Sequence, residues 1–273
     1  MEPAFELKNV TKRFRRADGS WNDALQGVSL TVRPGEAVAV IGPSGAGKTT
    51  LLRLLNQTLR PDAGEILVAG KNPGLLTSRE LRGLRAQTAT IYQQHNLVPN
   101  LRVVHNILAG KLFTWSLSRA VVSLLFPRNV QQAAEAAGSV GILNKFWERT
   151  DRLSGGEQQR VAISRALIQN PRNLLADEPV ASVDPSRADL LITLLRQVTD
   201  PDHKTLIVNL HDVPLALRNF PRIVGLHDGK LFFDLPPEEI SGTLLARLYE
   251  GEESIEGEQR PWIADTIKEG QAG

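Results

Sequence analysis

Residues 42–49 read Gly42-Pro43-Ser44-Gly45-Ala46-Gly47-Lys48-Thr49 and fit the phosphate-binding pattern G-x-x-x-x-G-K-[ST]. The apolar run 37–41 before this loop is typical of a buried strand, and the leucine-rich stretch 51–55 after it is typical of a helix. Glycines in such a loop let backbone N–H groups converge on phosphate oxygens, and the helix adds the positive end of its dipole. A turn that binds no ligand is the alternative, and the strand-loop-helix setting disfavours it.

The side chains of this loop predict nucleotide binding. Lys48 would bring a positive charge to the β- and γ-phosphates, and the hydroxyl of Thr49 would be a ligand for Mg²⁺. The nucleotide-binding residues expected here are Gly42, Pro43, Ser44, Gly45, Ala46, Gly47, Lys48, Thr49 and Thr50.

Two adjacent acids follow another apolar run, in Leu174-Leu175-Ala176-Asp177-Glu178-Pro179. We expect Asp177 to hold Mg²⁺ through the hydration shell of the ion and Glu178 to polarise an attacking water. Solvation of a strand end is the structural alternative, because acids are common at such ends. The phosphate-binding loop in the same chain disfavours that alternative.

A third motif, Leu153-Ser154-Gly155-Gly156-Glu157-Gln158-Gln159-Arg160, precedes a stretch with one apolar helical face. Ser154 and Glu157, three residues apart, predict a capping box at the start of this helix. Because a helix N-terminus attracts anions and two glycines let the backbone approach closely, the motif resembles a second phosphate-binding site. A simple helix cap is the alternative.

The hydrophobic patterns predict two kinds of sheet. Short alternating stretches predict an antiparallel sheet, and these are residues 5–10, 24–32 and 65–69. Continuous apolar runs predict buried parallel strands, and these are residues 37–41, 174–176 and 206–210.

The middle and the end of the chain have other patterns. Strand signals fade between about residues 96 and 153, where the Ala-rich stretch 130–141 predicts a helix, so we expect a mostly helical insertion. Near the end of the chain, residues 222–226 and 230–234 flank His227-Asp228-Gly229 and predict a hairpin.

Composition excludes several classes of protein. The chain has 273 residues, of which 41% are hydrophobic, so it can bury a large core. Its 32 basic and 30 acidic residues give a net charge of +2, and the basic run 12–16 is short, so we expect no nucleic-acid partner. The absence of Cys excludes disulfides and a Cys nucleophile. Because neither a secretion signal nor a bilayer-spanning stretch is apparent, we expect a cytoplasmic chain.

The Leu-Ser-Gly-Gly-Glu-Gln motif, between a phosphate loop and an acidic strand end, resembles the signature of ATP-binding-cassette (ABC) ATPases over most of the chain. The resemblance implies an α/β fold, in which a P-loop NTPase core carries a flanking antiparallel β subdomain and an α-helical subdomain inserted at about residues 96–155. We expect residues 1–249 to form this single ATPase domain and residues 250–273 to form an acidic, solvated tail.

The resemblance also assigns roles to single residues. Phe14 is similar to the aromatic residue that stacks on adenine, Gln93 to the glutamine that touches Mg²⁺ and senses the membrane partner, and His211 to the switch histidine at the γ-phosphate. Asp184 is similar to the acidic residue of a loop between subunits. The alternatives are packing for Phe14 and a structural role for His211, and the adjacent Gln94 leaves the match of Gln93 ambiguous. Asn173 departs from the apolar residue usual at its position, and we expect it to shorten the buried part of that strand.

Together these interpretations predict three sets of functional residues. The expected catalytic residues are Lys48, Gln93, Glu178 and His211. The expected Mg²⁺ ligands are Thr49, Gln93 and Asp177. The nucleotide-binding residues outside the phosphate loop are Phe14, Ser154, Gly155, Gly156, Glu157 and Asp184.

The resemblance implies a homodimer arranged head to tail, in which each ATP lies between the loop of one chain and the signature of the other. It also implies a separate transmembrane permease and a solute-binding protein, with this chain peripheral on the cytoplasmic face of the inner membrane. Leu112, Phe113, Trp115 and the cluster at 124–126 could line the permease contact, and core packing is the alternative.

The cargo is suggested by finer similarities. Residues 91–100, 114–128 and 175–182 resemble ATP-binding subunits of phosphonate importers, so we expect uptake of phosphonate or a related phosphorus oxyanion such as phosphite. An importer for a different small solute remains an alternative. A non-transport cassette would usually carry two cassettes or a long coiled coil, and a module that binds ATP without turnover would lack Glu178 or His211.

Overall fold

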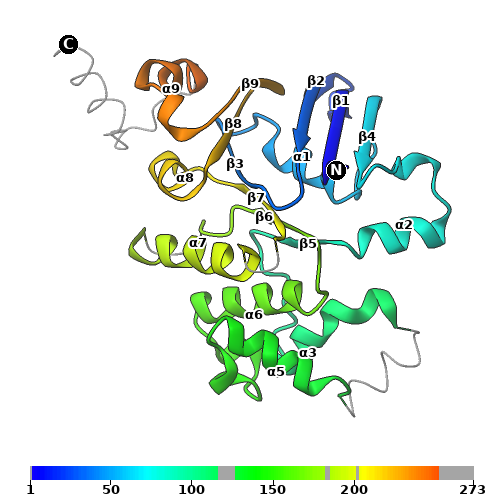
Figure 1. Ribbon diagram of the computed structural model, residues 1–273, viewed down its shortest axis with the longest axis vertical. Helices are drawn as coiled ribbons and strands as arrows, with labels where there is room; N and C mark the ends of the chain where they lie inside the picture. The colour runs from blue at the N-terminus through cyan, green and yellow to red at the C-terminus, as the bar shows by residue number, and fades with distance from the viewer. Residues whose placement is uncertain (1, 116–126, 182–184, 201–202, 252–273) are drawn as a thin grey trace. The chain divides into compact units, whose positions relative to one another are not determined.

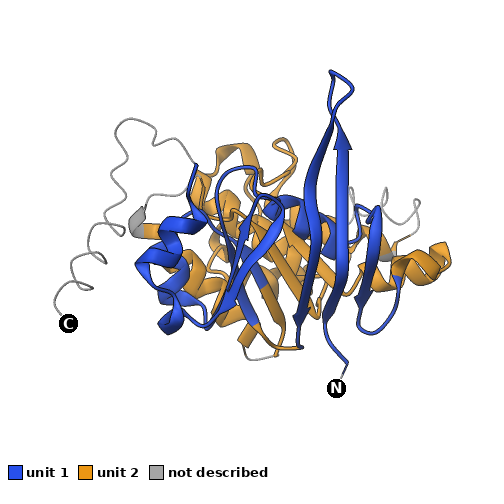
Figure 2. Ribbon diagram, turned by 90° about the horizontal axis from the view of Figure 1, so that it is seen from above, with its two compact units in different colours: residues 1–33, 37–72, 207–273 blue, residues 34–36, 73–206 orange. Residues whose placement is uncertain are grey.

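The computed structural model describes residues 2–115, 127–181, 185–200 and 203–251 (Figure 1). The chain divides into two compact units (Figure 2). Unit 1 comprises Met1–Arg33, Ala37–Asn72 and Ile207–Gly273, and unit 2 comprises Pro34–Glu36 and Pro73–Leu206. The expected single domain at 1–249, with its insertion at about 96–155, stays a prediction, and most of the expected tail lies outside the described residues.

Unit 1 contains the predicted antiparallel sheet. Its strands are β1 (Phe5–Arg15), β2 (Trp21–Val32) and β4 (Ala63–Val68), in the order β2-β1-β4. The apolar side chains of Phe5 and Leu7 are buried, as alternation requires of a sheet with one covered face. β1 and β2 both extend beyond the predicted ranges toward the turn at Asp18-Gly19, where their residues are exposed and carry no core signal.

Unit 1 also contains the strand that leads into the phosphate loop. β3 (Ala37–Ile41) is buried along its whole length and pairs in parallel with β8 (Arg222–His227). β8 turns at Asp228-Gly229 into antiparallel β9 (Lys230–Leu235), as the hairpin signal predicted. With β7 (Thr205–Asn209) on the other side of β3, the strand order is β7-β3-β8-β9. The remaining elements of this unit are α1 (Lys48–Leu55), α8 (Val213–Asn219), η6 (Pro237–Glu239) and α9 (Gly242–Leu248).

Unit 2 contains the strand that leads into the acidic pair. β5 (Thr88–Ile91) and β6 (Asn173–Asp177) pair in parallel, and β7 (Thr205–Asn209) begins beside β6, where Thr205 N donates to Arg172 O. The helices of this unit are η1 (Pro73–Leu75), α2 (Ser78–Arg85), α3 (Val103–Leu108), η2 (Ala109–Thr114), α5 (Val130–Ser139), η3 (Leu143–Lys145), η4 (Thr150–Arg152), α6 (Gly155–Leu167) and α7 (Pro185–Thr199).

The predicted helical region lies within unit 2. The Ala-rich stretch forms α5, which ends at Ser139, and its buried face carries Ala133 and Ala137. These small side chains let α5 pack closely on α6, where Ser164 Oγ donates to Ala136 O at 3.1 Å. The described residues between 96 and 153 form no strand. An isolated β-bridge pairs Arg102 with Arg149.

The expectation about Asn173 is wrong. Asn173 is the first residue of β6, and all five residues of this strand are buried. The amide fits inside because Asn173 Nδ2 donates to Thr88 Oγ1 at 3.3 Å on the neighbouring strand. A polar partner across the sheet therefore lets this position be buried without the apolar residue that is usual there.

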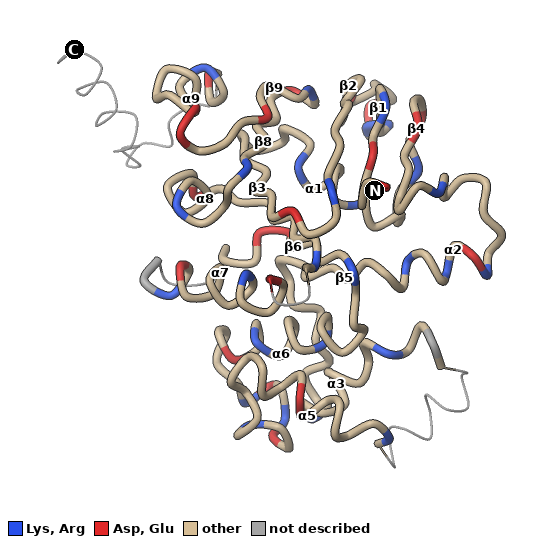
Figure 3. Tube along the Cα trace, viewed as in Figure 1, with Lys and Arg blue, Asp and Glu red and all other residues tan. Residues whose placement is uncertain are grey.

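Charged residues of both signs occur along individual elements, including β1 and α2 (Figure 3). Within the described residues, no helix is both long and apolar enough to cross a bilayer.

Candidate functional site

The phosphate loop holds the ammonium group of Lys48 against its own backbone. Lys48 is only 5% exposed, and its Nζ donates to the carbonyl oxygens of Gly42 at 2.6 Å and Pro43 at 3.0 Å. A buried ammonium needs such partners, because an unpaired charge is costly in a protein interior. The positive charge is thereby held inside the loop, where a bound phosphate would meet it.

Two glycines let the neighbouring backbone press against this loop. Gly42 has φ +148°, and a Cβ there would lie 2.0 Å from the carbonyl oxygen of Leu226 in β8. Gly47 has φ +102°, and a Cβ there would lie 2.3 Å from the carbonyl oxygen of Ala24 in β2. A side chain at either position would deform the loop, so both glycines are required by packing as well as by backbone conformation.

Helix α1 begins directly at the loop, with Gly47 as its N-cap. No side chain caps the helix, and its first turn contains no acidic residue. Helix N-termini of this kind carry a partial positive charge on their N–H groups. The loop, the helix end and Lys48 therefore favour a phosphate group, and the residues fit the nucleotide predicted from the sequence.

Unit 1 also holds Phe14 and His211. Phe14 lies near the end of β1 and is 36% exposed, and Lys12 Nζ lies 5.6 Å from the centroid of its ring. His211 is exposed and follows Leu210, whose N–H donates to Val40 O at 3.0 Å. This pairing places His211 at the edge of the sheet where β3 ends and the phosphate loop begins.

Unit 2 brings the acidic pair and Gln93 to one edge of its own strands. Ile91 of β5 pairs with Ala176 of β6, so Gln93 and Glu178 each lie two residues beyond a paired position. Asp177 is 9% exposed at the end of β6, whereas Gln93 is exposed. The predicted link between Gln93 and the acids is thus compatible with the register of the strands.

Glu178 has a backbone conformation that is rare for a residue with a side chain. Its φ is 49°, in the left-handed region, and Ala181 N donates to its carbonyl oxygen at 3.2 Å. Strain of this kind clusters at functional sites. Asp184, in the loop that follows, lies outside the described residues.

The signature motif forms the predicted capping box. Ser154 is the N-cap of α6, and its Oγ accepts from Glu157 N at 3.4 Å. The carboxylate of Glu157 in turn accepts from Ser154 N at 2.8 Å and from Ser154 Oγ at 2.9 Å. The backbone hydrogen bond from Ser154, more than any other contact, lowers the pKa of Glu157. Glu157 is therefore ionised at neutral pH and holds the first turn of α6 in place.

Among the described residues, nothing packs against the two signature glycines. A Cβ at Gly155 or Gly156 would meet no heavy atom within 4 Å, and both residues have ordinary helical backbone. The backbone at Gly155 and Gly156 has room for the Cβ of alanine, whereas a Cβ at Gly42 or Gly47 would collide with a neighbouring carbonyl oxygen. Within the described residues, the space beside these two glycines at the N-terminus of α6 is therefore unfilled.

Three residues tied to the signature were not predicted to have roles. Arg165 donates to the carbonyl oxygens of His95 and Asn96, just beyond Gln93. Asn106 and Thr150 form a buried pair joined by a 2.8 Å hydrogen bond. Burial of their polar groups is the signal that identifies these three residues, and the sequence does not show which polar residues are buried.

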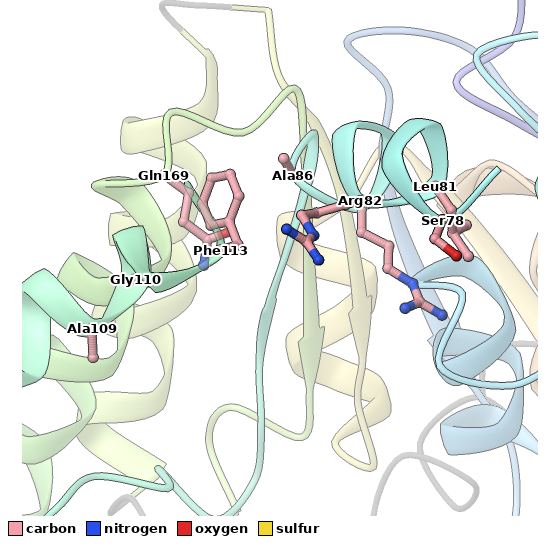
Figure 4. Close-up of a pocket in the computed structure, with 9 residues that line it drawn as sticks. Ser78, Leu81, Arg82, Ala86, Ala109, Gly110, Phe113 and Gln169 are labelled. Carbon is pink, nitrogen blue, oxygen red and sulfur yellow. The ribbon is translucent and has the colours of Figure 1, made fainter. Parts of the chain in front are cut away.

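A cavity of about 550 Å³ lies elsewhere in unit 2, among residues of α2 and η2 and Gln169, which follows α6 (Figure 4). Figure 4 shows Phe113 and Gln169 on one side of this cavity and Leu81 and Ser78 on the other. Arg82 and Arg85 contribute positive charge to its wall. Of the other residues considered for a permease contact, Leu112 is 48% exposed, and residues 124–126 lie outside the described residues.

The structure thus places the predicted residues in two groups. Unit 1 holds Phe14, the phosphate loop and His211, and unit 2 holds Gln93, the acidic pair and the signature. The family model described as ABC transporter matches residues 25–181, more than half of the chain. This chain belongs to the ABC transporter family. It is an ATPase of that family, and the predicted family and α/β cassette fold are confirmed.

Curated relatives are similar over nearly the full length. The chain is 45% identical over 244 residues to "Phosphonates import ATP-binding protein PhnC 1" of Pseudomonas syringae pv. tomato, covering 89% of this chain and 92% of that protein. It is 42% identical over 249 residues to "Phosphonates import ATP-binding protein PhnC" of Thiobacillus denitrificans, covering 91% of this chain and 93% of that protein.

Solved cassettes have the same fold. One is the dimeric structure of MJ0796, a bacterial ABC transporter cassette, with TM-score 0.74 and 30% identity over 86% of this chain and 100% of that chain. Another is the ADP conformation of MJ1267, with TM-score 0.76 and 24% identity over 92% of this chain and 100% of that chain. ABC cassettes dimerise and work with transmembrane components of transporter complexes.

Proposed function

We propose that this ABC ATPase energises the import of phosphonate, or of a related phosphorus oxyanion, through a separate membrane permease. The observation that supports this cargo is the 45% identity to a phosphonate import ATP-binding protein over 89% of the chain. The cargo itself need not touch this chain, because ATP-driven conformational change can be passed to a partner.

In this proposal unit 1 binds the nucleotide. Lys48 and the N-terminus of α1 neutralise the phosphates, and residues 42–50 wrap them with backbone N–H groups. The exposed ring of Phe14 offers a stacking surface for adenine, and His211 contacts the γ-phosphate from the end of β7.

We assign the activation of water, and ligands for Mg²⁺, to residues of unit 2. Glu178 would accept a proton from the attacking water, and Asp177 and Gln93 would offer carboxylate and amide oxygens, hard donors of the kind that Mg²⁺ prefers. Thr49, in the phosphate loop of unit 1, would offer a hydroxyl oxygen. When bound at these residues, Mg²⁺ would neutralise charge that develops on the β- and γ-phosphates. In the described parts, no group of three or more His, Asp or Glu side chains could hold a metal ion.

We propose further that the active form is a head-to-tail homodimer. Gly155 and Gly156 are open, and the capped N-terminus of α6 is a second anion site in a chain with one phosphate loop. Ser154, Gly155, Gly156 and Glu157 then face the nucleotide held by the partner, and Asp184 lies in the loop between the chains.

The cavity beside α2 is the proposed contact for the permease. Phe113 and Leu81 offer apolar surface, and Arg82 and Arg85 favour an acidic segment. This contact would hold the chain peripherally on the cytoplasmic face of the inner membrane, with a solute-binding protein on the opposite side.

Growth on a single phosphorus source tests the proposal. A strain that lacks the gene receives the wild-type chain, Lys48→Met or Lys230→Met, the last being an exposed lysine of the β8–β9 hairpin. With methylphosphonate or phosphite as sole phosphorus source, we expect growth with the wild type and Lys230→Met and none with Lys48→Met. Undiminished growth of the deletion strain on both sources would reject the proposed cargo.

A further inference from the structure

Arg165 joins the signature helix to the segment that follows Gln93. Its guanidinium donates to Asn96 O at 2.7 Å and to His95 O at 2.6 Å, from a position in the last turn of α6. Burial lowers the pKa of Arg165, yet the group remains charged because its ordinary pKa is so high. Arg165 uses two different nitrogens of its planar fork for these bonds, whereas lysine would offer a single Nζ on a flexible stem and lose the paired geometry.

His95 itself contacts the same helix. Burial lowers the pKa of His95, and hydrogen bonds between its ring and the side chains of Gln159 and Gln158 act in the opposite direction. Both glutamines belong to the signature motif. Residues 94–101, here called the exit segment, are therefore fixed at one end by three side chains of α6.

A buried pair fixes the other end of the exit segment. Asn106 and Thr150 are each 1% exposed, and Asn106 Nδ2 donates to Thr150 Oγ1 at 2.8 Å. The Asn106 side chain also accepts from Val98 N at 2.8 Å and donates to Val98 O at 3.0 Å. Thr150 Oγ1 and Thr150 N both donate to Leu101 O, at 2.9 and 3.0 Å.

We infer that Arg165 and the Asn106–Thr150 pair are positioning residues that lock the exit segment to the signature stretch, residues 149–165. Gln93 and Ser154 then move as parts of one body, although 61 positions separate them in the chain. A change sensed at Gln93 is transmitted to the signature through these bonds rather than through the intervening chain. The inference rests on the proposed roles of Gln93 and the signature.

Substitutions that keep side-chain size separate positioning from folding. Arg165→Lys keeps the charge and loses the fork, and Thr150→Val keeps the shape and loses the hydroxyl. Ser164→Ala is the matched control, because its fully buried hydroxyl bonds to Ala136 O at 3.1 Å and Arg160 O at 2.9 Å, away from the exit segment. The measurements are kcat for ATP hydrolysis and Kd for ATP.

We expect Arg165→Lys and Thr150→Val to lower kcat about 10- to 100-fold, the size of effect that misplacement of a catalytic group produces. The Kd for ATP should stay within about twofold, and Ser164→Ala should leave kcat within about twofold. Because Arg165 acts through Gln93, Arg165→Lys added to Gln93→Ala should cause no further loss. A loss no larger than that of Ser164→Ala, or one additive with Gln93→Ala, would overturn the inference.

Amide hydrogen exchange supplies a readout that does not depend on activity. We expect the amides of Val98 and Leu101 to exchange faster in both variants, with no change in the strands of unit 1. If Arg165→Lys fails to fold, Thr150→Val decides alone. A wild-type chain that hydrolyses no ATP would contradict the proposed function. Unchanged amide exchange in the exit segment of the variants would contradict the inference that these residues hold the segment to the signature stretch.

Discussion

Glu178 combines a half-buried carboxylate with a left-handed backbone at the end of a fully buried strand. The conformation turns the chain sharply after β6. Asp177 and Glu178 therefore differ in exposure although they are adjacent. This difference suits the two proposed roles, in which Asp177 holds Mg²⁺ and Glu178 activates water. The sequence predicts the pair, whereas the strained turn that separates their environments is visible only in the structure.

At this scale we predict the effect of Glu178→Gln. The amide keeps the size of the carboxylate and cannot accept the proton of water, so kcat for ATP hydrolysis should fall about 10²- to 10⁴-fold. The Kd for ATP should change little, because the phosphate-binding groups of unit 1 remain. Phosphate release and nucleotide binding measure the two quantities.

Glu148→Gln is the matched control, because Glu148 pairs with Lys145 at 3.0 Å on the surface of unit 2. Its hydrolysis should equal that of the wild type. Retention of more than a tenth of the activity by Glu178→Gln would contradict the assigned role.

Helix α6 is stabilised at its N-terminus by a capping box and yet carries two glycines in its first turn. Glycine in a helix is less stable than alanine by about 0.5–1 kcal/mol. We therefore predict that Gly156→Ala raises the free energy of unfolding by about this amount while it lowers ATP turnover, since the new methyl group lies where the partner's nucleotide would approach.

Gly138→Ala is the control for this split between stability and activity. Gly138 lies in α5, and a Cβ there would also meet no heavy atom within 4 Å. Thermal unfolding should show a gain in both variants, and turnover should fall in Gly156→Ala alone. Equal ATP turnover in Gly156→Ala and Gly138→Ala would contradict the proposal that the partner's nucleotide approaches Gly156.

The charge of Glu157 makes its contribution to the stability of the folded chain depend on pH. Its pKa in the folded chain lies below the ordinary value of 4.5, chiefly because of the backbone hydrogen bond from Ser154. The contribution to stability is therefore present above the unfolded pKa and is lost as pH falls through the folded one. We expect Glu157→Gln to lower the free energy of unfolding by about 0.3–1 kcal/mol at neutral pH, where the wild-type carboxylate is charged.

Urea unfolding of the two proteins at neutral pH and at about pH 3.5 measures this difference, which should shrink at the lower pH. A difference that stays constant would mean that the charge of Glu157 plays no part.

The whole molecule is predicted to work as two copies that share their sites. Lys48→Met destroys the loop half of a site, and Gly156→Asp destroys the signature half by placing a negative charge against phosphate. In an equimolar mixture half of the dimers are mixed, and each has one intact site. We predict about a quarter of the wild-type turnover from two variants that are each inactive alone.

Lys48→Met mixed with Glu178→Gln supplies the control, because the proposed arrangement assigns both residues to the same half of a site. That mixture should stay inactive. Recovery in both mixtures, or in neither despite dimer formation, would reject the head-to-tail arrangement.

The parts of this protein that the sequence determines are those set by short-range pattern. The phosphate loop, the capping box of Ser154 and Glu157, and the hairpin turn at Asp228-Gly229 each depend on residues a few positions apart, and the structure confirms these elements. The apolar run of β3 and the Ala-rich run of α5 are likewise readable, because their periodicity reports burial directly.

The tertiary structure alone decided the contacts between distant residues. Asn173 is buried because Thr88 lies across the sheet, 85 positions away, and Arg165 reaches carbonyl oxygens 69 and 70 positions away. A polar residue in a sequence gives no sign of its partner, since hydrogen bonds depend on distance in space. The sequence by itself therefore determined the motifs, whereas the hydrogen bonds that hold one motif against another were decided by the tertiary structure.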